Sequence, residues 1–312
     1  MMGLDYNLAI VLSRLSLIRY SPWLRRAIAV MTFALAALAF PQPALAGISV
    51  TGSITSNTTW AVADSPITVT GHVTVDAGVT LTVEPGVTVE FDGAKALDIN
   101  GTLIAQGTSS DKVTFTSSAA SPAAGDWGYI RFGASSVPAS FDGSGDYLSG
   151  SIFQHCTVEY AGYGSSTANT TQAIRGVFDS VSPFIDNCTI RHNADGGIHI
   201  SSGLNQTVKI TNNILDNNAS HGMNLYVKAG STFTIDGNTV TSSTSRGSSY
   251  SSAGDGIMLW SGTGAITGTV SNNTINGRRV VFATYQSSPR VAEAQAIGAP
   301  RFDLTIGGSI DS

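Results

Sequence analysis

Four side chains that could carry acid–base or anion-binding chemistry lie in the second half of the chain: Arg175, His199, His221 and Asp255. Histidines near an acid can transfer protons, and an arginine can neutralise the carboxylate of a uronic acid. In an enzyme these four would be the catalytic residues, and the matching reaction would be that of a polysaccharide lyase. For each residue alone, an exposed polar side chain without a role is the simpler interpretation.

Two large aromatic side chains, Tyr226 and Trp260, indicate binding rather than catalysis. Asn224 and Met258 precede them by two positions, so all four can point to the same face of two strands. Aromatic rings on an exposed face suit sugar rings or another apolar partner. The alternative is that neighbouring loops fold over the rings and bury them. Asn224, Tyr226, Met258 and Trp260 are therefore the candidate ligand-binding residues.

Short β-strands are the elements that must position these residues. Apolar and polar residues alternate in segments 73–75, 79–83, 87–91 and 97–99, and each run is followed by a turn that contains glycine. No helical period follows residue 46. Period-two runs between glycine turns predict an all-β fold made of many short strands.

One pattern recurs along the second half of the chain. Each copy has an apolar anchor residue, and the anchors are Val158, Ile190, Leu215, Val240 and Ile275. The two uninterrupted copies, from Ile190 to Leu215 and on to Val240, are 25 residues long. An apolar residue stands five positions before every anchor, and a further strand follows at Ile198 and Met223. This period is typical of a solenoid with three short strands per coil.

Stacked copies turn sequence columns into ladders. Two positions before the anchors, the column reads Cys156, Cys188, Asn213, Asn238 and Asn273. An asparagine ladder at a turn can hydrogen-bond to the coils above and below. The two cysteines would be neighbours, either as a disulfide or as a reduced stacked pair. One position after the anchors, Glu159, Arg191 and Asp216 predict a surface ladder of alternating charge with little energy in it.

Two insertions, 162–172 and 242–254, occur at the same turn of different coils and could form the walls of a cleft. Three outward columns would form its floor and edge. The first column reads Arg175, His199, Asn224 and Met258; the second reads Val177, Ser201, Tyr226 and Trp260; the edge column reads Gln172, Gly196, His221 and Asp255. This cleft is the predicted site.

Other chemistries are disfavoured. The sequence has no Gly-x-Ser-x-Gly, His-Glu-x-x-His or phosphate-loop motif, which argues against a serine hydrolase, a zinc peptidase and a nucleotide enzyme. Glycosidases use paired carboxylates and calcium-assisted lyases use an acidic cluster, but Asp255 stands alone at the floor. Asp186 and Asp236 share a column with Thr211 between them. We expect no metal site and no cofactor, with calcium only if the chain is a lyase.

The amino-terminal 46 residues predict a secretory signal. Arg25 and Arg26 precede an apolar run that ends near Phe40, and small residues lead to expected cleavage after Ala46. The run is too short for a comfortable membrane span, so none is expected in the mature chain. We expect a secreted protein at an extracellular or cell-surface location, with the periplasm as an alternative.

The remaining chain divides into a predicted N-terminal cap, 47–66, and a β-solenoid, 67–312, whose last coils are irregular. The whole chain has 312 residues, of which 42% are hydrophobic and 12% charged, with a formal net charge of −5. This composition excludes a disordered tail protein, and the acidic balance argues against nucleic acid as a partner. Alternation resumes at 302–306, as if another coil begins there. An uncapped coil would favour end-to-end association.

Several segments resemble one known architecture. They are 81–87 (LTVEPGV), 101–108 (GTLIAQGT), 113–117 (VTFTS) and 125–130 (GDWGYI). Over roughly residues 50–290 the chain is similar to secreted right-handed parallel β-helix repeat proteins of bacteria, the pectin-lyase-like fold. The resemblance implies a right-handed solenoid with three short strands per coil and about nine or ten coils. It implies little about activity, because such solenoids include lyases, hydrolases and adhesins.

Three functions are compatible with these observations. The first is a non-catalytic extracellular protein that binds a polysaccharide or cell-surface glycan through Tyr226 and Trp260. The second is a polysaccharide lyase, or a related carbohydrate-active enzyme, that acts on acidic polysaccharide through Arg175, His199, His221 and Asp255. The third is a structural envelope protein without a ligand.

Overall fold

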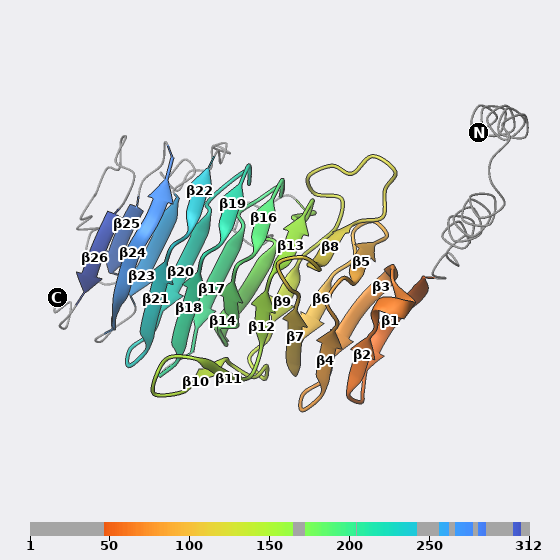
Figure 1. The fold of residues 1–312 in the computed structure, drawn as a ribbon, viewed down its shortest axis with the longest axis horizontal. Coiled ribbons are helices and arrows are strands. Elements are labelled where there is room, and N and C mark those ends of the chain that lie inside the picture. The colour runs from red at the N-terminus through yellow and green to blue at the C-terminus, as the bar shows by residue number, and fades with distance from the viewer. Residues whose placement is uncertain are drawn as a thin grey trace, which may run out of the picture. The chain divides into compact units, whose positions relative to one another are not determined.

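The computed structural model describes residues 47–164, 172–203, 205–241, 256–261, 266–276, 280–284 and 302–306. The described residues form a parallel β-helix in which strands of successive coils lie side by side (Figure 1). The predicted leader 1–46, Asp255, insertion 242–254 and most of insertion 162–172 lie outside the described residues. The same is true of the side chain of Val177.

Three parallel sheets run along the solenoid, and most coils contribute one strand to each. The first sheet contains β2 (Thr58–Trp60), β4 (Thr80–Val83), β7 (Thr102–Gln106), β12 (Ile152–Gln154), β15 (Phe184–Asp186), β18 (Thr207–Thr211) and β21 (Thr232–Asp236). The second contains β5 (Thr88–Phe91), β8 (Val113–Ser117), β13 (Cys156–Glu159), β16 (Thr189–Arg191), β19 (Ile214–Asp216) and β22 (Thr239–Thr241). The third contains β6 (Leu97–Ile99), β9 (Ile130–Phe132), β14 (Ile174–Ser180), β17 (Ile198–Ser202), β20 (Met223–Val227), β23 (Ile257–Ser261) and β25 (Val280–Thr284).

Some strands serve two sheets. β1 (Ile48–Ile54) and β3 (Ile67–Val75) bend from the second sheet into the third, and β24 (Thr267–Ile275) joins the first and second. A short 3-10 helix, η1 (Val62–Asp64), follows β2. The segment predicted to be a cap therefore contributes β1 and β2 as strands of the sheets, with Trp60 buried.

The predicted inward columns form the core. All five anchors, from Val158 to Ile275, are buried, and so are the apolar residues five positions before them. Strand pairing joins Val158 to Ile190, Ile190 to Leu215 and Leu215 to Val240, as the recurring anchor pattern predicts. Near the amino end, Phe91 and Trp127 stack with ring centroids 4.0 Å apart. Alternation fixes which side chains enter this core, because a shift of one residue would turn each apolar column outward.

The asparagine ladder is present at the turn between the first and second sheets. Asn213 Nδ2 donates to Asn238 Oδ1, and Asn238 Nδ2 donates to Asn273 Oδ1, both at 2.9 Å. The residue before each ladder position has a positive φ, for example 56° at Asn212 and 67° at Gly237. Asparagine and glycine tolerate this left-handed conformation best, which explains their recurrence at the turn.

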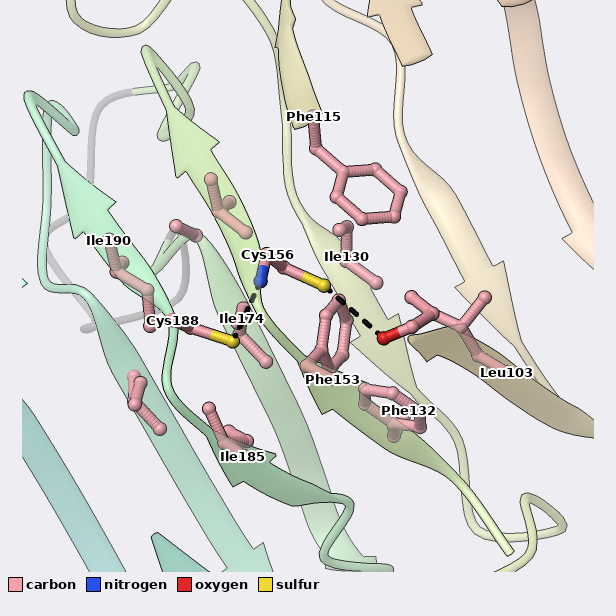
Figure 2. Packing of buried hydrophobic residues seen from close by; sticks show 14 of the residues in the cluster. Leu103, Phe115, Ile130, Phe132, Phe153, Cys156, Ile174, Ile185, Cys188 and Ile190 are labelled. Atoms are coloured by element: carbon pink, nitrogen blue, oxygen red, sulfur yellow. Dashed lines mark hydrogen bonds between the residues drawn. The ribbon is translucent and has the colours of Figure 1, made fainter. Parts of the chain in front are cut away.

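The cysteines continue this ladder as two free, buried thiols (Figure 2). The Cys156 backbone N–H donates to Cys188 Sγ at 3.4 Å, just as the Cys188 N–H donates to Asn213 Oδ1. Cys156 Sγ donates to the Ala105 carbonyl at 3.3 Å. Burial, together with a hydrogen bond to Cys188, raises the pKa of the Cys156 thiol well above its usual range. Of the two arrangements considered from sequence, the structure therefore has the reduced stacked pair and not the disulfide.

The predicted charge ladder is present in part. Arg191 Nε lies 2.8 Å from Glu159 Oε2, whereas Asp216 accepts a hydrogen bond from the Thr241 hydroxyl. Asp186 in the first sheet accepts hydrogen bonds from Thr211, Asn212, Gln154 and Asn187. Burial tends to raise the pKa of this carboxyl, but the four hydrogen bonds outweigh it and hold the pKa below its ordinary value. Glu159, Asp216 and Asp186 therefore each bond to a side chain of the following coil and link the two coils.

An antiparallel hairpin, β10 (Ser140–Phe141) and β11 (Tyr147–Ser149), packs on the outside of the first sheet. Phe141 and Tyr147 cover Ile152 and Phe184, two apolar residues of that outer face. Lys209 fixes the hairpin, because its Nζ donates to the Gly145 carbonyl at 2.6 Å. The sequence analysis did not predict this element.

The carboxyl-terminal strand differs from its prediction. β26 (Phe302–Ile306) pairs antiparallel with β24, with Leu304 opposite Val270. It therefore does not begin another parallel coil, as its alternation suggested, but returns along the last strand of the first sheet (Figure 1). Alternation sets which face of a strand is buried but not the direction in which the strand runs, so sequence could not distinguish the two.

Candidate ligand-binding face

The outward side of the third sheet brings most of the predicted site residues into one ladder. Strand pairing joins Arg175 to His199, His199 to Asn224 and Asn224 to Met258, in the predicted order. The same ladder continues toward the amino end through Arg131 and Asp98. We refer to the outward side of β6, β9, β14, β17, β20 and β23 as the third-sheet face.

The second predicted column is only partly correct. Ser201, Tyr226 and Trp260 are paired as expected. Val177 does not pair with Ser201, because the register between β14 and β17 shifts after Gly176 and resumes at Ser180. An irregularity of this kind adds residues to one strand and breaks a ladder that is counted at a fixed interval.

Two guanidinium groups meet one aromatic ring at the amino-terminal end of this face. The Arg175 guanidinium carbon lies 4.3 Å from the centroid of Tyr129, and that of Arg131 lies 5.8 Å from it. Asp98 pairs with Arg131 Nε at 2.7 Å, so Arg131 has a carboxylate partner. Arg175 is half-buried, and this burial lowers the pKa of its guanidinium from its ordinary value. An arginine remains charged at neutral pH, so Arg175, which has no ion pair among the described residues, presents positive charge on this face.

His199 lies next to this charge and is largely shielded from solvent. Burial, and then the positive charge of Arg175, lowers the pKa of His199 to about 4. The imidazole is therefore neutral at neutral pH. Its Nδ1 atom is buried and has no hydrogen-bond partner in the described part of the chain.

The edge column is also assembled. Gln172 packs against Gly196, where an added Cβ would lie 3.1 Å from Gln172 Cγ and 2.9 Å from the His221 carbonyl. Gln172 and His221 are both buried rather than exposed, contrary to the sequence interpretation. Neither polar atom of the Gln172 amide has a hydrogen-bond partner among the described residues. The fourth member of the column, Asp255, lies outside the described residues.

Sequence reasoning missed Asp195. This buried acid lies in the turn before β17, and its negative charge acts on both Arg175 and His199. Asp195 stands one position before Gly196. The predicted edge column contains Gly196, so it does not include Asp195. An acid directly before the Gly196-Gly197 turn was the only sequence signal, and the fold was needed to place it beside the arginine.

The carboxyl-terminal half of the face is more covered than predicted. Tyr226 and Trp260 are half-buried neighbours on paired strands, but Asn224 and Met258 are only 7% and 5% exposed. The expected exposure of Asn224 and Met258 is therefore wrong, whereas their part in ligand binding stays a prediction. A ladder residue has neighbours above and below it, and these shield a medium-sized side chain that points outward.

No group of three or more potential metal-ligating side chains of His, Cys, Asp or Glu occurs among the described residues. Within the same residues, no helix has the length and apolar character needed to cross a bilayer. The third-sheet face offers three kinds of contact to a ligand. Arg175 carries positive charge, His199 is a neutral hydrogen-bonding group, and Tyr226 and Trp260 provide aromatic surface.

Comparison with known families identifies the fold. The family model described as the right handed beta helix region matches residues 109–275, which is more than half of the chain. The chain has no significant match to a curated protein or to a solved structure.

Proposed function

Because the chain belongs to the right-handed β-helix family, we propose that it is a binding protein, a function that other solenoids have. Its third-sheet face binds an acidic polysaccharide without catalysis. The observation that carries this proposal is the placement of Arg131 and Arg175 on Tyr129, in the same sheet as Tyr226 and Trp260. Cations recognise carboxylates, and aromatic rings recognise the apolar faces of sugars.

The spacing of the sheet supports this function. Side chains of one column repeat at about 4.8 Å along the solenoid axis. From Arg175 to Met258 the column passes through His199 and Asn224, and Tyr226 and Trp260 lie beside its last two members. A glycan that runs along the axis would meet the charge of Arg175 first and the aromatic rings two and three coils later.

We also propose an extracellular or cell-surface location, which rests on the predicted signal in residues 1–46. A polysaccharide partner is compatible with that location. The neutral state of His199 favours binding over proton transfer, because a histidine with a pKa of about 4 is a weak base at neutral pH.

Binding can be tested by affinity electrophoresis and calorimetry of the purified full chain with polygalacturonate, and with methyl-esterified polygalacturonate as the uncharged comparison. We expect Arg175→Gln to weaken binding to the acidic polymer at least about tenfold. Trp260→Ala should weaken it by a similar factor. Lys112→Gln removes an exposed cation elsewhere, and Leu148→Ala removes an exposed apolar side chain of the hairpin on the first sheet, so neither control should change affinity.

Absence of binding by the parent chain to polygalacturonate, alginate and hyaluronate would contradict the proposal and favour the structural envelope protein. Equal affinity in the parent chain, Arg175→Gln and Trp260→Ala would also contradict it, because the binding surface would then lie elsewhere.

A lyase is the second candidate, and one observation favours it. His199 Nδ1 and the Gln172 amide are buried polar groups without partners in the described residues, and the charges of Arg175 and Asp195 act on His199. Unsatisfied polar groups beside charges with shifted pKa values are typical of active sites. Incubation with the same polymers, with and without calcium, would give an ultraviolet-absorbing unsaturated product if the chain were a lyase. No absorbance change with any of these polymers would contradict the lyase.

A further inference from the structure

A separate hollow lies at the turns that lead out of the second sheet. Its volume is about 360 Å³, and its lining includes Pro122, Tyr160, His192, Asn217 and Ala219. This volume is in the range of small-molecule sites. None of these residues belongs to the third-sheet face, and none was a candidate in the sequence analysis.

The floor of the hollow is a ladder of three turn residues on successive coils. Tyr160, His192 and Asn217 each follow the last residue of a second-sheet strand, β13, β16 and β19. All three have a positive φ, of 65°, 55° and 50°. The shared backbone conformation holds their side chains in register, one coil apart.

The rings of this floor are fixed in place. Tyr160 and His192 stack with centroids 5.9 Å apart and an interplanar angle of 16°. His192 Nδ1 lies 3.0 Å from Asn217 Nδ2. An amide nitrogen can only donate, so Nδ1 accepts and the neutral ring carries its proton on Nε2.

Two hydrogen-bonding groups remain available on this floor. Within the described part of the chain, neither the Tyr160 hydroxyl nor His192 Nε2 has a hydrogen-bond partner. Both side chains are only partly buried. The hollow therefore offers a hydroxyl and a ring N–H, next to aromatic carbon and the apolar surface of Pro122 and Ala219.

The charge around the hollow selects the kind of ligand. Its lining contains no Lys, Arg, Asp or Glu side chain among the described residues. The nearest charged residues in sequence, Glu159 and Arg191, pair with each other at 2.8 Å. A charged ligand would lose its hydration here without gaining a counter-ion, whereas a neutral ligand would not.

We propose that this hollow binds one uncharged sugar unit, as a second glycan site distinct from the acidic-polysaccharide site. The aromatic rings and the proline would contact the C–H groups of the sugar. The Tyr160 hydroxyl, His192 Nε2 and the Asn217 carboxamide would bond to its hydroxyls. The site is independent of the proposed function of the third-sheet face.

The test titrates the purified full chain with the methyl glycosides of glucose, galactose, mannose and N-acetylglucosamine, and follows the imidazole signals of His192 by NMR. We expect at least one glycoside to shift these signals saturably. Tyr160→Asn and His192→Asn should each weaken its binding about tenfold. Asparagine tolerates the positive φ and is the natural residue at the same turn, two coils after Tyr160 and one coil after His192, so both variants keep the turn.

His155→Asn is the matched control, because it makes the same change at a residue of φ 49° in a different turn. It should leave glycoside binding unchanged, as should Arg175→Gln. The proposal is overturned if no glycoside shifts the His192 signals, or if Tyr160→Asn binds as the parent does. Loss of glycoside binding in Trp260→Ala but not in Tyr160→Asn would place the neutral sugar on the third-sheet face instead. If the parent chain binds a glycoside but not polygalacturonate, only the proposed function of the third-sheet face is contradicted.

Discussion

At the scale of single residues, Asn238 shows how a coil keeps polar groups inside the core. Its Oδ1 accepts from the Asn213 backbone N–H at 3.0 Å and from Asn213 Nδ2, while its own Nδ2 donates to Asn273 Oδ1 and to the Ile210 carbonyl. The side chain is completely buried. Each amide satisfies backbone groups of the turn that water cannot reach.

We predict that Asn238→Ala lowers the free energy of unfolding by about 3 kcal/mol, because it leaves buried donors and acceptors of the neighbouring coils unpaired. Chemical denaturation would measure this loss. Asn276→Ala, at an exposed position near the same end of the solenoid, should cost less than about 0.5 kcal/mol. Similar losses in both variants would mean that the ladder contributes nothing specific.

His199 predicts a pH dependence of stability. Its pKa falls from an ordinary value of 6.5 to about 4 on folding, because burial and the nearby Arg175 disfavour the charged ring, while Asp195 opposes this effect. Between pH 6.5 and 4 the unfolded chain binds a proton that the folded chain does not, so this residue destabilises the fold as the pH falls. The full effect is roughly 3 kcal/mol.

Urea unfolding at pH 7, 5.5 and 4 would measure this slope in the parent chain and in His199→Gln, which cannot titrate. We expect the parent to lose more stability than the variant across this range. His221 also faces His199, so His221→Gln should be measured in parallel. Equal slopes in the parent chain and His199→Gln would show that His199 is not held neutral by the fold.

At the scale of elements, the β10–β11 hairpin acts as a cover for an apolar patch. Lys209 reaches across from β18, with Nζ 5.0 Å from the ring centroid of Phe141 and 5.4 Å from that of Phe184. The hydrogen bond from Lys209 to the Gly145 carbonyl adds a polar contact to these cation–π contacts. One side chain thus links the hairpin to the sheet below it.

Lys209→Ala should therefore cost about 1–2 kcal/mol and loosen the hairpin. Hydrogen exchange would show faster exchange at Asp142 and Gly145, whose N–H groups bond within the hairpin turn. Lys112→Ala removes an exposed lysine and should change neither quantity. Unchanged exchange in Lys209→Ala would show that the aromatic contacts alone hold the cover.

At the scale of the whole molecule, a coil depends on the coils before and after it, so the ends of the solenoid determine whether it associates. β26 lies along β24 as an antiparallel strand and occupies its backbone hydrogen-bonding groups. The end-to-end association expected from sequence depends on an uncovered strand edge at the end of the solenoid. In the first sheet, β26 covers the edge of β24.

Removal of residues 302–312 should therefore increase self-association, because the edge of β24 becomes available to another chain. Sedimentation velocity at several concentrations would detect this as a larger, concentration-dependent coefficient. Removal of 307–312 alone keeps β26 and should leave sedimentation unchanged. If the 302–312 deletion sediments as the full chain does, β26 is not what limits association.

The sequence by itself determined the coils. The alternation of Val87–Phe91, the 25-residue step from Ile190 to Leu215 and the recurring asparagines fix strand, column and ladder, because each depends only on spacing along the chain. The order of Arg175, His199, Asn224 and Met258 follows from the same spacing. The family resemblance agrees with the match over residues 109–275.

Only the tertiary structure decided what surrounds those columns. The burial of Asn224, the place of Asp195 beside Arg175, the stacking of Tyr160 on His192 and the direction of β26 all depend on which residues of different coils come into contact. Such contacts have no fixed interval in sequence, because turns vary in length while strands repeat. A regular strand ladder is therefore predictable from spacing, and the site built at its edges becomes visible only after the chain has folded.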